Sequence, residues 1–397
     1  MSLLFRKIFS SLILLSALTL AACQTTTQRN RPTSDGSAPI SVEKLPPRTL
    51  HQQQTMSGIT QQDKMRVAIL LPLTGTNAQL GQDLLASAQM SLFDHGSNQL
   101  ELMIHDTQGT PAQASAAAQQ ALHEGAQLIV GPLFSQEVAA VKAIASQANV
   151  PVLSFSNNQK VADSQVFILG FDPSEQVREI ISVAAAHNIR NIGALLPENA
   201  YGDLLQDALV QAVAHNDIRI EAIAFYRPGT SDFSAQAIKL RNIPLQGLFV
   251  PEGGDTLKLV ISSLQYNDVD LTQVRLLGSG QWDTPQTFTT SSARGGWFVA
   301  PAPYKRAQFE QKFRTQFGHS PPRIATLSYD AMSLAAILSQ TRQGNSLMLS
   351  ELTQPRGFDG IDGTFRLIPN GLVERRLAVL EVANHGVKVV SPAKAEF

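Results

Sequence analysis

The most constraining feature of this 397-residue sequence is a regular alternation of short apolar runs with alanine-rich segments of helical period. Residues 65–72, MRVAILLP, have the length and continuous apolarity of a strand that is buried on both faces. Residues 79–93 have the spacing of an amphipathic helix. Because this pair recurs along the chain, it predicts parallel strands joined by helices, an α/β fold. The other predicted strands are 100–105, 128–130, 151–154, 191–197, 219–225, 248–251 and 275–278, and the other predicted helices are 112–124, 136–148 and 202–216.

The length of the chain favours two lobes. Residues 63–397 exceed what a single hydrophobic core usually serves, and the strand series restarts at residue 191. In open parallel sheets, ligands bind beyond the carboxyl ends of the strands. We therefore expect the functional site in the loops at these ends. Those loops begin at Thr74, Pro132, Phe155, Asn199, Glu252 and Ser279.

The N-terminus has the layout of a secretion signal. Arg6 and Lys7 precede an apolar run, residues 8–20, that ends in small residues before Cys23. This run is shorter than the roughly 20 residues that a membrane-spanning helix needs. Residues 20–23, LAAC, resemble the lipobox of bacterial lipoproteins, which implies cleavage of a 1–22 signal peptide and acylation of Cys23, palmitate included. The alternative is an ordinary signal peptide with a chance cysteine.

The segment that follows is predicted to be a flexible tether. Residues 23–62 are poor in large apolar side chains and rich in Gln, Thr, Ser and Pro, so they cannot bury enough surface to fold. Cys23 is the only cysteine, which excludes an internal disulfide. Acyl chains on Cys23 would attach the protein stably to a membrane. In the lipoproteins that this segment resembles, an aspartate directly after the cysteine favours the inner membrane. Gln24 stands at that position here, so the resemblance implies the periplasmic face of the outer membrane.

Composition and motifs argue against several functions. With 31 basic and 32 acidic residues the net charge is −1, so no basic surface for nucleic acid is expected. The sequence contains no HExxH pair, no GxSxG elbow and no P-loop. The acidic glycine-rich strings 251–255 and 359–363 lack the ligand spacing of a calcium loop and are predicted to be turns. We therefore expect a protein without catalytic residues, metal or cofactor.

Four strings carry a family resemblance. They are PLTGTNAQLGQ (72–82), IVGPLFSQEVAAVKAIASQANVPVLSFSNN (129–158), NAYGDLLQDAL (199–209) and GFDGIDGTFRLIPNG (357–371). They resemble the type I periplasmic-binding fold, and within it the leucine, isoleucine and valine binding branch. The resemblance implies two Rossmann-like lobes with parallel sheets and a three-strand hinge. It divides the chain into residues 63–177 plus 302–350 as one lobe and residues 178–301 plus 351–397 as the other.

The same resemblance implies a ligand cleft between the lobes. In amino-acid binders of this branch, serines hold the ligand carboxylate, and a tyrosine and an acid hold its ammonium group. Ser135 and Tyr201 match this pattern, whereas the acid after the late strand is replaced by Gly280 or Gln281. Without that acid a buried ammonium would lack a counter-charge worth several kcal/mol, which disfavours free amino acids. The cleft candidates are Thr74, Ser135, Ser156, Asn157, Tyr201, Gln281, Trp282 and Asp283.

Several of these residues have a purely structural alternative. Tyr201, before Gly202, has the position of a helix-entry residue as well as that of a cleft residue. Ser135 and Ser156 have the positions of helix caps. Trp282 would serve equally well as a filler of a hydrophobic gap. Asp283 lies two or three positions beyond the expected acid and is the nearest substitute for it.

A narrower resemblance concerns the partner. Residues 276–285, 295–303, 317–331 and 371–382 look like a lipoprotein subgroup of this fold known as penicillin-binding protein activators. That resemblance implies docking on a peptidoglycan synthase and its stimulation. The alternative is the substrate-binding receptor of an ABC transporter for amino acids or a related small polar solute. An enzyme acting on cell-wall fragments is the third hypothesis.

Overall fold

A computed structural model describes residues 64–96, 98–341, 349–384, 386–394 and 397. All of them belong to one compact unit, residues 60–397. The signal peptide, the lipidated Cys23 and the tether predicted for residues 1–62 lie outside the described residues. No described helix is long and apolar enough to cross a membrane.

The first lobe contains a parallel sheet in the order β2-β1-β3-β4-β5. Six of the seven residues of β1 are buried. The unbroken apolar run predicts this for a central strand that is covered on both faces. The strands are β1 (Met65–Leu71), β2 (Leu100–Asp106), β3 (Leu128–Val130), β4 (Val152–Ser154) and β5 (Val166–Ile168).

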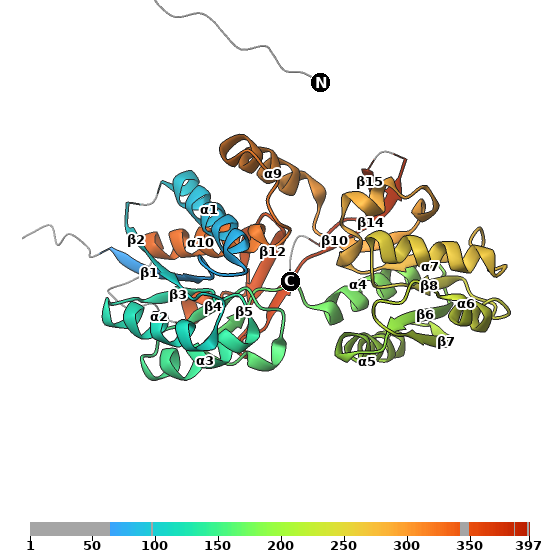
Figure 1. Ribbon diagram of the computed structural model, residues 1–397, viewed down its shortest axis with the longest axis horizontal. Coiled ribbons are helices and arrows are strands. Elements are labelled where there is room, and N and C mark those ends of the chain that lie inside the picture. The colour runs from blue at the N-terminus through green and yellow to red at the C-terminus, as the bar shows by residue number, and fades with distance from the viewer. Residues whose placement is uncertain (1–63, 97, 342–348, 385, 395–396) are drawn as a thin grey trace, which may run out of the picture. The chain divides into compact units, whose positions relative to one another are not determined.

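Helices cover both faces of this sheet (Figure 1). Leu84 of α1 and Leu327 of α10 join the core on one face, and Ala118 of α2 and Val138 of α3 join the core on the other. A further helix, α9, packs on the outer side through Phe309. These helices are α1 (Ala78–His95), α2 (Pro111–His123), α3 (Ser135–Gln147), α9 (Pro303–Phe317), α10 (Ala325–Thr341) and the short α11 (Leu349–Leu352).

The second lobe is built on a larger sheet in the order β15-β14-β10-β9-β8-β6-β7. Its first five strands along the chain are parallel, and β14 and β15 add an antiparallel ribbon at one edge. The strands are β6 (Asn191–Pro197), β7 (Arg219–Tyr226), β8 (Gly247–Phe249), β9 (Arg275–Gly278), β10 (Trp297–Ala300), β14 (Ala378–Ala383) and β15 (Gly386–Ser391).

Two layers of helices enclose this second sheet (Figure 1). Ile180 of α4 and Leu209 of α5 lie in the core on one face, and Leu240 of α6 and Leu257 of α7 lie in the core on the other. The α/β class and the parallel sheets predicted from the sequence are thereby confirmed. The helices are α4 (Pro173–Ala186), α5 (Ala200–Ala214), α6 (Ser234–Leu240), α7 (Gly254–Tyr266) and α8 (Pro285–Thr289), with the 3-10 turns η1 (Gln159–Val161), η2 (Gly280–Trp282) and η3 (Ser291–Ala293).

The chain passes between the lobes three times. These passages lie between β5 and α4, between β10 and α9, and between β13 and β14. The last passage differs from the boundary expected at residue 351. A small antiparallel sheet, β11 (Phe358–Gly360), β12 (Gly363–Leu367) and β13 (Val373–Arg375), comes first. Phe358, Phe365 and Leu367 enter the first lobe's core because they complete its apolar surface, so this segment belongs to lobe 1.

Local signals explain how the strand-end loops are shaped. Asn199 caps α5, since its Oδ1 accepts hydrogen bonds from Tyr201 N and Gly202 N, both at 3.0 Å. A Cβ at Gly202 would overlap the carbonyl oxygen of Pro197, so glycine lets the helix begin directly over the end of β6. This close approach brings the Tyr201 side chain to the carboxyl edge of the sheet.

Candidate functional site

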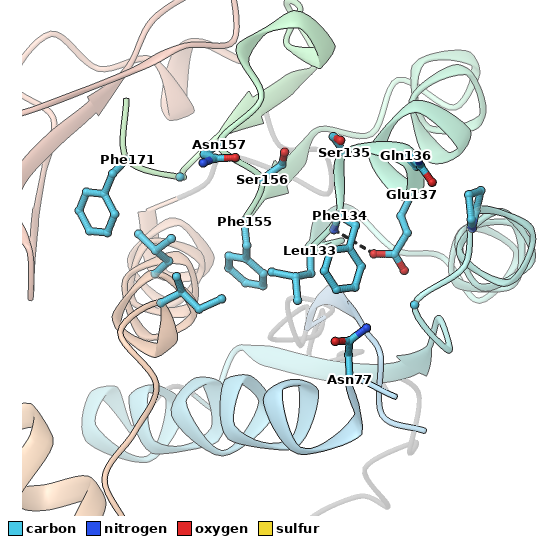
Figure 2. Close-up of a pocket in the computed structure, with 15 residues that line it drawn as sticks. Asn77, Leu133, Phe134, Ser135, Gln136, Glu137, Phe155, Ser156, Asn157 and Phe171 are labelled. Carbon is cyan, nitrogen blue, oxygen red and sulfur yellow. Dashed lines mark hydrogen bonds between the residues drawn. The ribbon is translucent and has the colours of Figure 1, made fainter. Parts of the chain in front are cut away.

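The carboxyl end of the first sheet carries a cavity of about 670 Å³. Its polar lining comes from Ser135, Ser156 and Asn157, and Phe134 and Phe155 give it an apolar surface (Figure 2). Hydroxyl, amide and aromatic groups therefore converge in a space large enough for a small organic molecule.

The first turn of α3 opens on this cavity. Ser135 and Gln136 line it, and the first-turn NH groups of a helix have no acceptor within the helix. Glu137 folds back so that its Oε2 accepts the NH of Phe134 at 2.9 Å, which fixes the start of the helix (Figure 2). Burial raises the pKa of Glu137, although its hydrogen bonds to Thr107 and to the backbone oppose this shift. The remaining NH groups and the helix dipole favour an acceptor group such as a carboxylate.

Ser156 lies in a loop that is tied to the neighbouring strand end. Ser154 Oγ donates to the carbonyl of Pro132 at 2.9 Å and accepts from Ser156 N at 3.0 Å. Ser156 Oγ in turn accepts from Asn158 N at 3.1 Å, which leaves its own hydroxyl proton available to donate. The Ser156 hydroxyl is thus placed as a preorganised donor at the cavity.

A second cavity, of about 410 Å³, lies toward the other lobe. It is lined by Tyr201 and Gln281 from the second lobe and by Arg323 from the first. Asn157 and Phe171 line both cavities. The two spaces therefore adjoin along these residues and form one cleft with walls from both lobes, which we call the interlobe cleft.

Asp283 joins the lobes electrostatically. Its carboxylate forms an ion pair with Arg306 of α9 and a second with Arg323, at 3.4 Å. Burial raises the pKa of Asp283, and the two guanidinium groups oppose that shift. Because two guanidinium groups already compensate the charge of the Asp283 carboxylate, it is a poor partner for a ligand cation.

Behind the cleft, the hinge side of lobe 1 contains a buried charged network. Arg323 also pairs with Asp362 at 3.1 Å, and Thr326 Oγ1 donates to the same carboxylate at 2.5 Å. Arg375 pairs with Asp330 at 3.4 Å, and both side chains are buried. Its guanidinium lies 5.4 Å from the ring centroid of Phe171, the aromatic residue that lines the cleft. The buried guanidinium of Arg375 thus packs against a residue that lines the cleft.

Glu175 connects this network to lobe 2 and should make stability depend on pH. Its carboxylate accepts the backbone NH of Arg375 at 3.1 Å, and burial raises its pKa to about 7. Since the folded state then binds the proton more tightly than the unfolded state, the free energy of unfolding should fall as the pH rises from about 5 to about 7. Urea titrations across this range should show that slope. Glu175→Gln should flatten it, whereas Glu179→Gln, one turn further along α4, should retain it; an unchanged slope in Glu175→Gln would contradict the assignment.

The sequence-predicted residues separate into those at the cleft and those elsewhere. Ser135, Ser156, Asn157, Tyr201, Gln281 and Asp283 line its two cavities. Thr74 lines neither of them; its hydroxyl donates to Asp106 at 2.5 Å at an exposed loop. Trp282 is fully buried, and its Nε1 donates to Val250 O at 2.9 Å, so it packs in the core of lobe 2 instead of lining the cleft.

Sequence reasoning did not single out Arg323 or Glu137. Arg323 reaches Asp283 and Asp362, partners 40 and 39 positions away in the chain, so no local motif marks it. Glu137 bonds back to the NH of Phe134, but phenylalanine cannot accept a capping hydrogen bond through its side chain, so no capping motif in the sequence marks it. Among the described residues, no group of three or more His, Cys, Asp or Glu side chains is arranged to hold a metal ion.

Comparison with known families decides the classification of the fold. The model of the periplasmic binding protein family matches residues 64–386. The chain belongs to this family. This periplasmic binding protein is 26% identical over 208 residues to the Leu/Ile/Val-binding protein homolog 6 of Brucella melitensis, covering 49% of the chain and 53% of the relative. The chain spans about half the length of the curated relatives it matches.

Solved structures agree on the fold of this periplasmic binding protein. A branched-chain amino acid ABC transporter periplasmic ligand-binding protein from Burkholderia xenovorans superposes with a TM-score of 0.69 at 14% identity, covering 83% of this chain and 95% of that one. A branched-chain amino acid transporter substrate binding protein from Streptococcus pneumoniae, in complex with isoleucine, gives a TM-score of 0.59 at 18% identity, covering 83% and 100%. The type I periplasmic-binding fold is therefore established for residues on both sides of the cleft.

Proposed function

We propose that this chain is a receptor that holds a small organic solute in the interlobe cleft and delivers it to an ABC transporter. The observation that carries the proposal is the cleft itself, since its two cavities adjoin at Asn157 and Phe171 and take their polar linings from both lobes. A ligand that contacts both linings favours closure of the lobes, because it binds the closed state better than the open one. Isoleucine in the S. pneumoniae structure supports a ligand of this size.

The carboxylate of such a ligand fits the lobe 1 side. There the first turn of α3 offers free NH groups beside Ser135, and the Ser156 hydroxyl is oriented by its neighbours. Charge-assisted hydrogen bonds of this kind contribute about 1.5–3 kcal/mol each. We further propose a periplasmic location with lipid attachment at Cys23, as the lipobox resemblance implies.

Ser156→Ala is expected to weaken binding of a carboxylate ligand by about 10-fold, equivalent to about 1.4 kcal/mol, because one oriented donor is lost. Calorimetric titration of the purified full chain with amino acids, small organic acids and short peptides identifies the ligand and supplies the reference affinity. Ser146→Ala, an exposed serine near the other end of α3, is the matched control and should bind as the unmodified chain does. Equal affinities for Ser156→Ala and Ser146→Ala would place the carboxylate elsewhere.

A second function, activation of a peptidoglycan synthase, is favoured by one observation. Asp283 pairs with Arg306 and Arg323 across the cleft, and such pairs would hold the lobes together for docking on a protein. This function predicts no heat with any small solute and retention of a purified penicillin-binding protein in a pulldown, with a rise in its synthetic rate. A solute of micromolar or tighter affinity would decide for the receptor.

A further inference from the structure

Lobe 2 has a cavity at the sheet edge opposite to the interlobe cleft. Its volume is about 460 Å³, and its lining includes Gln246, Arg275 and Trp297, which stand at or directly before the first residues of β8, β9 and β10. These strands are parallel, so they all begin at the edge away from the carboxyl ends that form the cleft. We call this cavity the basal pocket. A molecule bound in it would not compete with a ligand in the cleft.

The charged side chains that line the basal pocket are basic. Arg275 and Arg294 line it together with the titratable His187, and none of its lining residues is an aspartate or a glutamate. Glu381, which does not line the pocket, pairs with Arg275 at 3.9 Å and also accepts the indole NH of Trp297 at 3.0 Å. Arg294 forms no ion pair with any described residue. The pocket therefore has a positive charge that the protein itself does not compensate.

Uncharged groups of the pocket add hydrogen-bond donors. Gln246 Oε1 accepts the backbone NH groups of Arg190 at 2.6 Å and Asn191 at 3.1 Å, so the NH2 group is the unused end of this lining side chain. Asp270, an acid close to the pocket in sequence, accepts the NH and the hydroxyl of Thr272 at 2.9 and 2.6 Å. Its charge is thus already partly satisfied. Donors and positive charge together make the pocket suitable for an anion.

The donors are held in place by packing around one indole ring. The Arg275 guanidinium lies 4.9 Å from the ring centroid of Trp297 and donates to Gly295 O. His187 meets the same ring edge-on with centroids 4.8 Å apart, and its Nδ1 donates to Val183 O at 2.9 Å. A Cβ at Gly295 would lie 3.1 Å from Arg275 Nη1, so glycine leaves room for the guanidinium. Such preorganisation lowers the entropic cost of binding.

We propose that the basal pocket binds a phosphate monoester, carried either by a small soluble molecule or by a lipid headgroup. A phosphate monoester has about 1.5 to 2 negative charges at neutral pH and three terminal oxygens, so it accepts from several donors at once. Guanidinium groups bind its oxygens in pairs, and Arg275 and Arg294 supply two such groups. The cavity of about 460 Å³ exceeds the phosphate itself and leaves room for the group that carries it. This site is independent of the proposed receptor function, because the cleft lies at the other edge of the sheet.

Calorimetric titration of the full chain in phosphate-free buffer tests the proposal. Glucose 1-phosphate is the soluble probe, and glucose and acetate are its controls. Glucose 1-phosphate should bind at least about 10-fold more tightly than acetate, and glucose should give no heat. Arg294→Gln should weaken binding of glucose 1-phosphate by about 10-fold, because one charge-assisted donor is lost. Arg241→Gln, at an exposed arginine of lobe 2 outside the pocket, is the matched control and should bind as the unmodified chain does.

A second substitution checks the site without removing an arginine. Ser292 is exposed and lines the pocket, so Ser292→Glu adds a negative charge there and should reduce the affinity for glucose 1-phosphate by at least about 10-fold. Ser262→Glu, the same substitution at an exposed serine of α7, should leave the affinity unchanged. Melting curves followed by circular dichroism should coincide for all these variants, since the replaced side chains are exposed.

Short-chain phosphatidic acid, used below its micelle concentration, is the lipid probe, and short-chain phosphatidylcholine is its control. Tighter binding of phosphatidic acid than of glucose 1-phosphate, lost in Arg294→Gln, would support the proposal with a lipid as the carrier. The reverse order, with the same loss, would support a soluble carrier. The proposal is overturned if neither phosphate probe binds or if acetate binds as tightly as glucose 1-phosphate. It is equally overturned if Arg294→Gln and Ser292→Glu bind as well as their matched controls.

Discussion

Arg375→Met is expected to lower the free energy of unfolding by about 3–5 kcal/mol, because it leaves buried carboxylates without their guanidinium partner. Arg375 is 4% exposed, its Nη1 lies 3.4 Å from Asp330 Oδ2, and its guanidinium contacts the ring faces of Phe171 and Phe365. The methionine fills similar volume and contacts the same rings, so the loss reports mainly the unpaired charge. Urea unfolding monitored by far-ultraviolet circular dichroism, which reports on the helices and strands of both lobes, measures it.

The destabilisation caused by Arg375→Met should also depend on pH. Burial raises the pKa of Asp330 to about 7 even with Arg375 in place. Without the arginine the proton should bind still more tightly, so the destabilisation should be smaller near pH 5, where Asp330 is neutral, than near pH 8. A loss of stability that is the same at both pH values would show that packing, and not charge, is responsible.

Two variants complete the experiment. Adding Asp330→Asn to Arg375→Met removes one stranded charge and should recover part of the loss, since neighbouring members of a network are not additive. Arg366→Met is the matched control, because Arg366 lies on β12 and pairs with the partly exposed Glu374 at 2.6 Å. An exposed pair of that kind contributes no more than about 1 kcal/mol.

The fold could be predicted because its longest buried strands carry an unambiguous pattern. The strands predicted at 65–72 and 191–197 are observed as β1 (Met65–Leu71) and β6 (Asn191–Pro197). In both, continuous apolar residues reflect burial on two faces, which is a property of the strand's own sequence. The sequence did not predict β5, which contains only Val166–Ile168, although it did predict the equally short β3.

The lobe boundary expected at residue 351 differs from the observed passage between β13 and β14 for another reason. The small sheet β11-β12-β13 is antiparallel, and Phe365 and Leu367 alternate with partly exposed residues along β12. Alternation of this kind indicates that one face of the strand is buried, but it does not indicate which lobe that face packs against. Only the long-range packing on the core of lobe 1 decides the question.

In the candidate site, too, the sequence predicted the features that depend on local pattern and missed those that depend on long-range contacts. The strand-end loops that form the cleft followed from the parallel topology, since all carboxyl ends of such strands lie at one edge. The ion pairs of Asp283 did not, because they depend on Arg306 and Arg323, which folding brings in from other parts of the chain.

Trp282→Ala is expected to destabilise lobe 2 by about 3–5 kcal/mol, because it would leave a large cavity in a closely packed core. Trp282 is fully buried, and its ring centroid lies 6.2 Å from that of Phe298. A Cβ at either Gly278 or Gly296 would crowd the indole, so the surroundings are shaped around this side chain. The indole also donates to Val250 O at 2.9 Å, and its removal leaves that buried carbonyl without this donor.

The adjacent residue provides the contrast that separates packing from binding. Gln281 lines the cleft, so Gln281→Ala should change stability by no more than about 0.5 kcal/mol but weaken ligand binding. Trp282→Ala should instead lower the melting temperature of lobe 2, read from the fluorescence of the remaining Trp297, well beyond the change in Gln281→Ala. If Trp282→Ala left stability intact and reduced affinity alone, the indole would belong to the ligand site. Because Trp282 also links the loop after β9 to β8, the two variants together test whether the core of lobe 2 positions the cleft.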